Sequence, residues 1–319
     1  MNRSDPDLCI DVMKLVLAYD NEAAKRVDDN GVALHCAIQR RPQLHPLGVI
    51  QFLLDHNKDA VKVVDKYGRL PVHIAAGEGT FQVMKLLLDV FPEGANVIPN
   101  SPCDQNLLQV ALEDREKVEY LCSKYPAMLK RRNDCGYLPI HTTVERDYFN
   151  YSIMRIICEA GGLEQLKIPV IHPTDTEDYR KGYLPLHVFL HGHSEYFNGD
   201  KTENDRVEQA DALRYLLRMY PEAAGIVAGA GNEPLTRPMN PYQMALTWCE
   251  RIPKQYLRLL LRAAPTLDPV ALHRFNYEQR RMAMFVACRA VVAAGAKKLL
   301  LARLRLEHHD LFRYVVSFL

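Results

Sequence analysis

A short segment with the pattern Gly-x-Leu-Pro-x-His recurs along the chain and constrains the fold more than any other feature. It occurs at residues 68–73, 136–141 and 182–187, and residues 31–35 carry a version that is one residue shorter. Two weaker copies have Gln109 and Gln243 in place of the histidine. A unit that recurs every few tens of residues is typical of a stacked repeat array rather than a globule built around one site. The pattern therefore favours a binding surface over an enzyme.

The copy that covers residues 65–97 shows what each position does. Gly68 ends a turn segment and can adopt the positive φ that tight turns often need. Pro71 suits the first position of a helix, where its missing N–H costs nothing. Apolar residues at helical spacing over residues 81–88 predict a second helix, and Pro92 ends it. Each unit is therefore expected to be a turn followed by two antiparallel helices.

A turn and two antiparallel helices within roughly 33 residues resemble the ankyrin repeat. In that family the histidine bonds to backbone in and beside the turn and ties neighbouring repeats together. The threonine that the family has before the proline is leucine here, at Leu70, Leu138 and Leu184, so the threonine–histidine hydrogen bond cannot form. The resemblance implies that the recurring glycines, prolines and histidines are structural: His35, Gly68, Pro71, His73, Gly136, Pro139, His141, Gly182, Pro185 and His187.

The predicted fold is all-α, an ankyrin-like helical-repeat solenoid with a C-terminal helical cap. Residues 1–29 are expected to form an N-terminal half-repeat or cap, residues 30–265 about six repeats, and residues 266–319 the basic cap. Insertions are expected near residues 163–180, 191–209 and 225–238.

The N-terminal segment and the helix ends carry two further signals. Residues 11–17 match residues 82–88, which belong to the predicted second helix, so we expect the chain to begin halfway through a unit. Either Met1 is a late start or another element covers the face that a preceding helix would cover. The Tyr-Pro-Glu-Ala helix end at residues 220–223, together with the tail at residues 300–319, resembles divergent ankyrin-domain proteins abundant in diatoms.

The ankyrin resemblance implies that a partner binds on the concave face, through turn tips and first helices. Tyrosine and arginine combine a large contact area with hydrogen-bonding reach, which makes them good anchors. The tip residues expected to bind are Tyr67, Arg69, Tyr137, Arg180, Lys181 and Tyr183. We therefore expect a monomeric, non-catalytic scaffold with a protein partner of unknown identity and no small-molecule substrate.

The charge distribution leaves a second hypothesis open. The net charge is +1, yet residues 251–319 hold thirteen lysines and arginines against four acidic residues. Helices at residues 297–307 and 310–319 could bind nucleic acid or an acidic membrane through these charges. The competing interpretation is a cap whose leucines pack inward and whose charges face water.

The residues that could carry chemistry are better explained by the repeat. His187, His191 and His193 could bind zinc from a helix, but His187 already occupies the structural position and Gly192 interrupts the helix. The eight cysteines are scattered without a Cys-x-x-Cys pair, as in reduced intracellular proteins. We expect no catalytic residue, metal or cofactor. The absence of a secretory signal and of a long apolar run predicts a cytoplasmic or nuclear protein.

Overall fold

The structure is a computed structural model, and it describes residues 6–20, 22–28, 31–39, 47–99, 105–145, 149–171, 182–192, 203–228, 238–248 and 254–264. The chain divides into two compact units, Met1–Ile252 and Pro253–Leu319. In the described part of the first unit every regular element is a helix, apart from isolated bridges between Asp28 and Gly31 and between Ala228 and Met239. The prediction of an all-α fold is confirmed.

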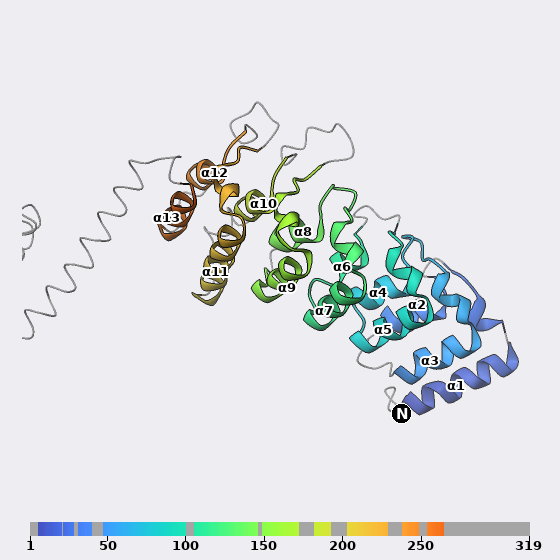
Figure 1. Cartoon of the computed structure of the whole chain (residues 1–319). Helices are drawn as coiled ribbons and strands as arrows, with labels where there is room; N and C mark the ends of the chain where they lie inside the picture. Colours follow the sequence, from blue (N-terminus) through green and yellow to red (C-terminus); the bar gives the residue numbers. More distant parts are fainter. Residues whose placement is uncertain are drawn as a thin grey trace, which may run out of the picture. The chain divides into compact units, whose positions relative to one another are not determined.

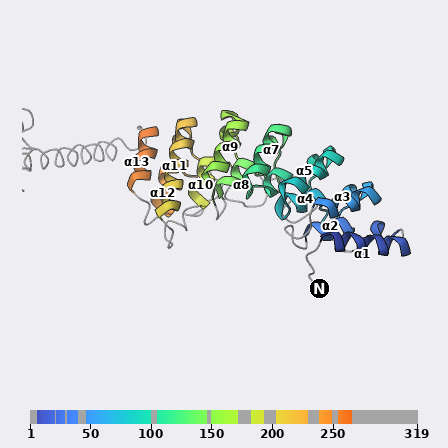
Figure 2. The same cartoon turned by 90° about the horizontal axis from the view of Figure 1, so that it is seen from below.

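Within the first unit the helices form two layers (Figures 1 and 2). The first helices of the repeats are α2 (Ala33–Gln39), α4 (Pro71–Gly77), α6 (Leu107–Val110), α8 (Pro139–Glu145), α10 (Pro185–Gly192) and α12 (Pro241–Trp248). The second helices are α3 (Leu47–His56), α5 (Phe81–Val90), α7 (Arg115–Lys124), α9 (Tyr151–Gly161) and α11 (Glu203–Met219), and α1 (Pro6–Tyr19) precedes them. We number the pairs α2–α3 to α10–α11 as repeats 1 to 5, and α12 begins repeat 6.

Each repeat packs on its neighbours in both layers. In the first layer α4 contacts α2 and α6, and in the second layer α5 contacts α3 and α7. A short 3-10 helix follows α1 and each of the second helices: η1 (Ala23–Lys25), η2 (Lys58–Lys62), η3 (Pro92–Asn96), η4 (Pro126–Lys130), η5 (Leu163–Lys167) and η7 (Pro221–Gly225). The prolines at the starts of η3, η4 and η7 cannot extend the α-helix before them, which explains why the helices end there.

The core between the layers comes from the same four positions of each second helix. In α5 these positions are Val83, Met84, Leu87 and Leu88, and in α9 they are Ile153, Met154, Ile157 and Cys158. Their spacing places them on one face of the helix, toward the first layer and the neighbouring second helices. Thr80 begins α5 by accepting a hydrogen bond from the Val83 backbone N–H at 3.3 Å.

Lys117 is an exception to this apolar core. It occupies in α7 the position that Val83 has in α5, and it is only 2 % exposed. Its Nζ donates to the carbonyl oxygens of Ala76 at 3.0 Å and Gly79 at 2.7 Å, at the end of α4. Burial lowers the pKa of Lys117, against the opposing effect of Asp114, whose carboxylate lies 3.6 Å away. The lysine thus ties repeat 3 to the C-terminus of the first helix of repeat 2.

Helix α1 packs against α3 and leaves a second apolar face uncovered among the described residues. By the match between residues 11–17 and 82–88, Val12 corresponds to Val83 and Val16 to Leu87. The exposed fractions of Val12 and Val16 are 51 % and 49 %, compared with 6 % and 1 % for Val83 and Leu87. The difference arises because α5 has a first helix of its own repeat beside it, and α1 has none in the described chain.

The structure corrects the predicted limits of two insertions. Residues 163–167 form η5, which has a counterpart in the other repeats, so repeat structure continues past residue 163. Residues 203–209 belong to α11. Between these elements, residues 172–181 and 193–202 lie outside the described residues.

In the second unit the structure describes α13 (Lys254–Ala263), in which Tyr256, Leu260 and Leu261 are buried. The predicted C-terminal cap at residues 266–319 lies outside the described residues. None of the described helices combines the length and the apolar character that crossing a membrane requires.

Candidate protein-interaction site

A finger, as used here, is the segment that leaves a 3-10 helix, turns and enters the next first helix. Finger 2, at residues 63–70, precedes repeat 2, and its turn is closed by backbone hydrogen bonds from Asp65 to Arg69 (3.0 Å) and from Gly68 to Asp65 (2.9 Å). Gly68 has a φ of 71°, which favours glycine. Finger 4 repeats this geometry, with Asn133 in the place of Asp65 and Gly136 at a φ of 74°.

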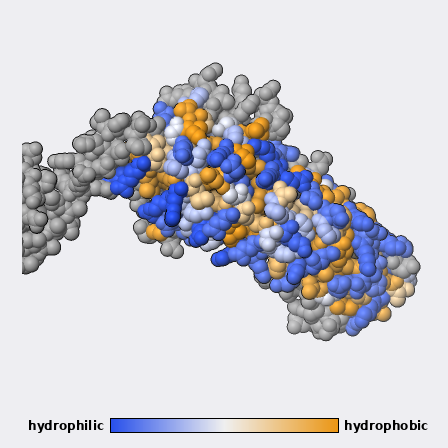
Figure 3. Space-filling model, viewed as in Figure 1, coloured by the Kyte–Doolittle hydropathy of each residue, from blue (hydrophilic) through white to orange (hydrophobic). Residues whose placement is uncertain are grey.

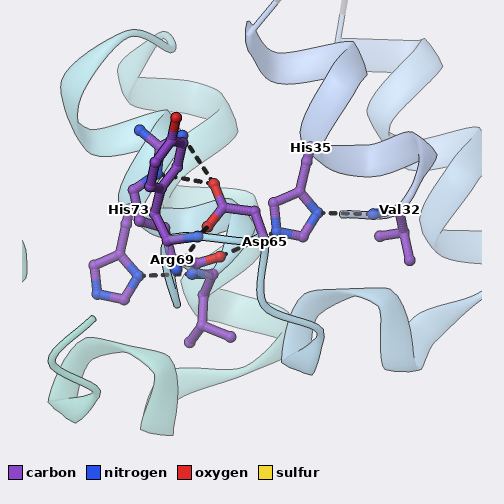
Figure 4. A network of polar contacts seen from close by, with 7 residues as sticks. Val32, His35, Asp65, Arg69 and His73 are labelled. Carbon is purple, nitrogen blue, oxygen red and sulfur yellow. Dashed lines mark hydrogen bonds and ion pairs between the residues drawn. The ribbon is translucent and has the colours of Figure 1, made fainter. Parts of the chain in front are cut away.

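The Asp65 carboxylate holds finger 2 together (Figure 4). Its Oδ1 accepts from the backbone N–H groups of Tyr67 and Arg69, both at 2.9 Å. Its Oδ2 accepts from the Arg69 guanidinium at 2.9 and 2.8 Å. Burial alone would raise the pKa of Asp65, but these hydrogen bonds lower it below its ordinary value. Asp65 is therefore an ionised anchor of the turn.

The recurring histidines lock each first helix to its finger. In all four cases Nδ1 accepts the backbone N–H three residues earlier, from Val32, Leu70, Leu138 and Leu184 at 3.1 to 3.3 Å. Since Nδ1 accepts, the proton of the neutral ring lies on Nε2. In repeat 2 the backbone N–H of Leu70 makes this bond, so the bond does not require a threonine side chain.

The Nε2 atoms of three of these histidines link the repeat to the next finger. His35 donates to the Arg69 carbonyl at 3.2 Å, His73 to Val97 at 3.0 Å and His187 to Ile226 at 2.9 Å. His141 Nε2 lies near the Ile168 backbone without a hydrogen bond of good geometry. Burial lowers the pKa of all four rings, to about 4 for His187 and about 3 for His141.

Repeats 3 and 6 use a second version of the lock. Gln109 Oε1 accepts from the Asn106 N–H at 3.1 Å, and Asn106 Oδ1 accepts from the Gln109 N–H at 3.0 Å. Asn240 and Gln243 form the same reciprocal pair, at 3.1 and 2.9 Å. The asparagine was not identified from the sequence, although it stands three residues before the glutamine in both copies.

Of the predicted binding residues, Tyr67 and Arg69 lie together on finger 2. Tyr67 is 47 % exposed, and the Lys66 Nζ and the Arg69 guanidinium carbon each lie 5.1 Å from its ring centroid. The guanidinium is partly exposed beside the ring, with 27 % of the Arg69 side chain accessible. Finger 2 therefore presents an aromatic ring close to two cations.

The expectation that Tyr137 and Tyr183 are exposed tips is wrong, since they are 4 % and 1 % exposed. Counted from the turn glycine, both correspond to Arg69 and not to Tyr67. In these two repeats the tyrosine after the glycine faces its own first helix, with ring centroids 5.8 Å from His141 and 5.6 Å from His187. Arg180 and Lys181 lie outside the described residues.

A groove of 240 Å³ opens between repeats 2 and 3. It is lined by Arg69, His73, Gly77 and Glu78 of repeat 2 and by Gln105 and Val110 of repeat 3. At this volume it is smaller than the roughly 300–1,000 Å³ of small-molecule sites.

An exposed apolar residue recurs in the fingers and was missed from the sequence. Val27, Val64 and Val227 each follow the residue that ends a 3-10 helix, and they are 60 %, 46 % and 56 % exposed. Finger 5 exposes Ile171 nearby, at 52 %. Figure 3 shows apolar residues interspersed with polar ones on the visible face of the described residues. Alignment of the residues after each 3-10 helix could have identified this row.

The residues considered for metal binding and redox chemistry have structural surroundings. The His191 ring packs on Tyr183 with centroids 6.2 Å apart, and His193 lies outside the described residues. Across the described ranges, no group of three His, Cys, Asp or Glu side chains is placed to hold a metal ion. Burial raises the pKa of the Cys122 and Cys158 thiols to about 12, which makes them unreactive.

The paired helices, glycine turns and buried histidines define a helical-repeat protein of the ankyrin type. Residues 34–88, which run from α2 into α5, match the family model described as ankyrin repeats in many copies. The match covers this segment, and the described repeats that follow it have the same turns and paired helices.

Other comparisons add little to this assignment. No curated protein matches the chain. Among solved structures, the chain is similar to one from the complex of a predatory endopeptidase of Bdellovibrio bacteriovorus with an immunity protein. The two are 15 % identical with a TM-score of 0.47, over 60 % of this chain and 90 % of that chain. A likeness at this level has no functional implication.

Proposed function

We propose that the chain is a non-catalytic scaffold that binds a protein partner along its fingers and first helices. The row of exposed apolar residues at one finger position carries this proposal. Single exposed apolar residues need no explanation, but recurrence at the same position of three repeats indicates a surface that is used. Burial in the fold does not require these valines, because the same position holds Arg132 in finger 4 and Pro169 in finger 5.

Finger 2 adds specificity to this surface. Tyr67, Lys66 and Arg69 offer a ring and two cations in the same finger as Val64. Aromatic and arginine side chains are enriched among the residues that dominate binding energy. The recurring glycines, prolines and histidines keep the fingers in place, and the exposed valines occupy other positions. Binding and scaffold functions are thus divided between different positions of the same repeat.

The test replaces Val27, Val64 and Val227 together with serine. The matched control replaces Val90 and Val207, which are 40 % and 50 % exposed on the second helices, with serine. We expect proteins retained from extracts of the native cells by the unchanged chain to be retained by the control and lost from the finger variant, with equal helicity by circular dichroism. Equal retention by both variants would refute the proposed surface.

A further inference from the structure

In repeats 4 and 5 a side chain of the protein itself fills the space that corresponds to the groove between repeats 2 and 3. There the residue after the turn glycine is tyrosine, and its ring lies against the histidine four positions later. Tyr137 also reaches the residue eight positions later, with its hydroxyl 3.4 Å from Glu145 Oε1. Tyr183 likewise packs on His191, eight positions later. Two repeats therefore use an aromatic ring to cover the same part of the first helix.

In repeat 2 that place is open. The residue after the glycine is Arg69, and the positions four and eight residues later are His73 and Gly77, which both line the groove. The Arg69 guanidinium pairs with Asp65 in the turn, at 2.8 and 2.9 Å. Gly77 has no side chain where Glu145 and His191 stand, and a Cβ there would lie 3.2 Å from Val110 Cγ1. The groove is thus the space of a missing ring, bounded on its far side by repeat 3.

We propose that this groove receives a tyrosine side chain of the protein partner, so the inference rests on the proposed function. The ring would lie over His73 and Ile74, as the rings of Tyr137 and Tyr183 lie over His141 and His187. Glu78 and Gln105 border the groove and offer acceptors to the hydroxyl, as Glu145 does for Tyr137. The volume suits one side chain better than a cofactor.

The test is a nuclear magnetic resonance titration of the full chain with N-acetyl-tyrosinamide. We expect saturable shifts of the Gly77 and Glu78 amides with a dissociation constant on the order of 1 mM, as for other ligands with few non-hydrogen atoms. N-acetyl-alaninamide should give no saturable shift, and N-acetyl-phenylalaninamide should bind at least about threefold more weakly because it lacks the hydroxyl.

Two variants of Arg69 make the test specific. Arg69→Tyr places the chain's own ring in the groove and should weaken tyrosinamide binding at least about tenfold. Arg69→Gln also loses the pair with Asp65 but leaves the groove open, so its affinity should stay within about threefold of the unchanged chain. Shifts that persist in Arg69→Tyr, or that never saturate, would overturn the proposal, and equal binding of phenylalaninamide would overturn the choice of tyrosine. None of these outcomes depends on the valine row, whose variants test the proposed function separately.

Discussion

The histidine locks predict that the array loses stability in weak acid, and His187 allows the effect to be measured. In the folded chain the pKa of His187 is lowered by burial to about 4, compared with 6.5 for a free histidine. Between these values the unfolded chain binds a proton that the folded chain does not, so stability falls as the pH drops through this window and this histidine causes no further loss below about pH 4. From pH 7 to pH 5 the loss is about 2 kcal/mol for this one side chain.

The perturbation is the double change Leu184→Asn with His187→Gln. It transplants into repeat 5 the Asn–Gln pair of repeats 3 and 6, which makes the corresponding backbone bond without a group that titrates in this range. We expect the variant to lose about 2 kcal/mol less than the unchanged chain between pH 7 and pH 5. Urea denaturation followed by circular dichroism measures this difference, and hydrogen exchange of the residue-184 amide reports on the local lock.

The control is His56→Gln, which removes an exposed histidine from α3. Between pH 7 and pH 5 the control should lose nearly as much unfolding free energy as the unchanged chain, and more than the repeat 5 variant loses. If the repeat 5 variant lost as much stability as the unchanged chain over this interval, the assignment of a neutral, Nε2-protonated ring at His187 would be refuted.

Three further predictions follow from burial and charge. Tyr183→Ala should cost about 3–5 kcal/mol of unfolding free energy, whereas Tyr67→Ala should change it by no more than about 0.5 kcal/mol, because only the ring of Tyr183 is buried. A similar cost for both variants in urea denaturation would contradict the inward orientation of Tyr183. Lys117→Met should cost about 1–3 kcal/mol, since the carbonyls that end α4 lose their donor, and an unchanged midpoint in urea would count against that role. If the basic C-terminal region binds nucleic acid or acidic membrane, Lys297→Glu with Lys298→Glu should release the chain from heparin or anionic vesicles at lower salt, and a chain that is not retained at low salt would exclude this alternative.

The repeat architecture could be predicted because its signals are local. A glycine at a turn, a proline at a helix start and a histidine three residues into the helix each satisfy a requirement of the backbone beside them. Leu70 shows that the lock survives a departure from the family pattern, because the backbone N–H and not the side chain makes the bond to His73. Only the side chain of the residue that donates this bond differs from the family pattern, and the bond does not depend on that side chain.

The candidate site was harder to predict because exposure depends on the register within the finger. Tyr67, Tyr137 and Tyr183 share a residue type but not a position relative to the turn glycine, and only Tyr67 faces outward. The role of Lys117 was missed for a similar reason. The sequence shows a lysine at an otherwise apolar helix position, but it does not show that this lysine donates to two carbonyl oxygens of the preceding repeat. Both cases require contacts between segments that are distant in sequence.

The residue after the turn glycine determines whether the first helix of its repeat is covered by a side chain or borders a groove. In repeats 4 and 5 a tyrosine covers the first helix of its own repeat, whereas in repeat 2 Arg69 turns to Asp65 and leaves a groove beside the exposed Tyr67. The turn itself is the same in both cases, since the backbone bond across it is 3.0 Å in finger 2 and 2.9 Å in finger 4. A single side chain can therefore open or close a groove without disturbing the hydrogen bonds that hold the array together. Repeats with one scaffold can thus differ in the surface that they expose, and repeat 2 of this chain exposes both Tyr67 and the groove.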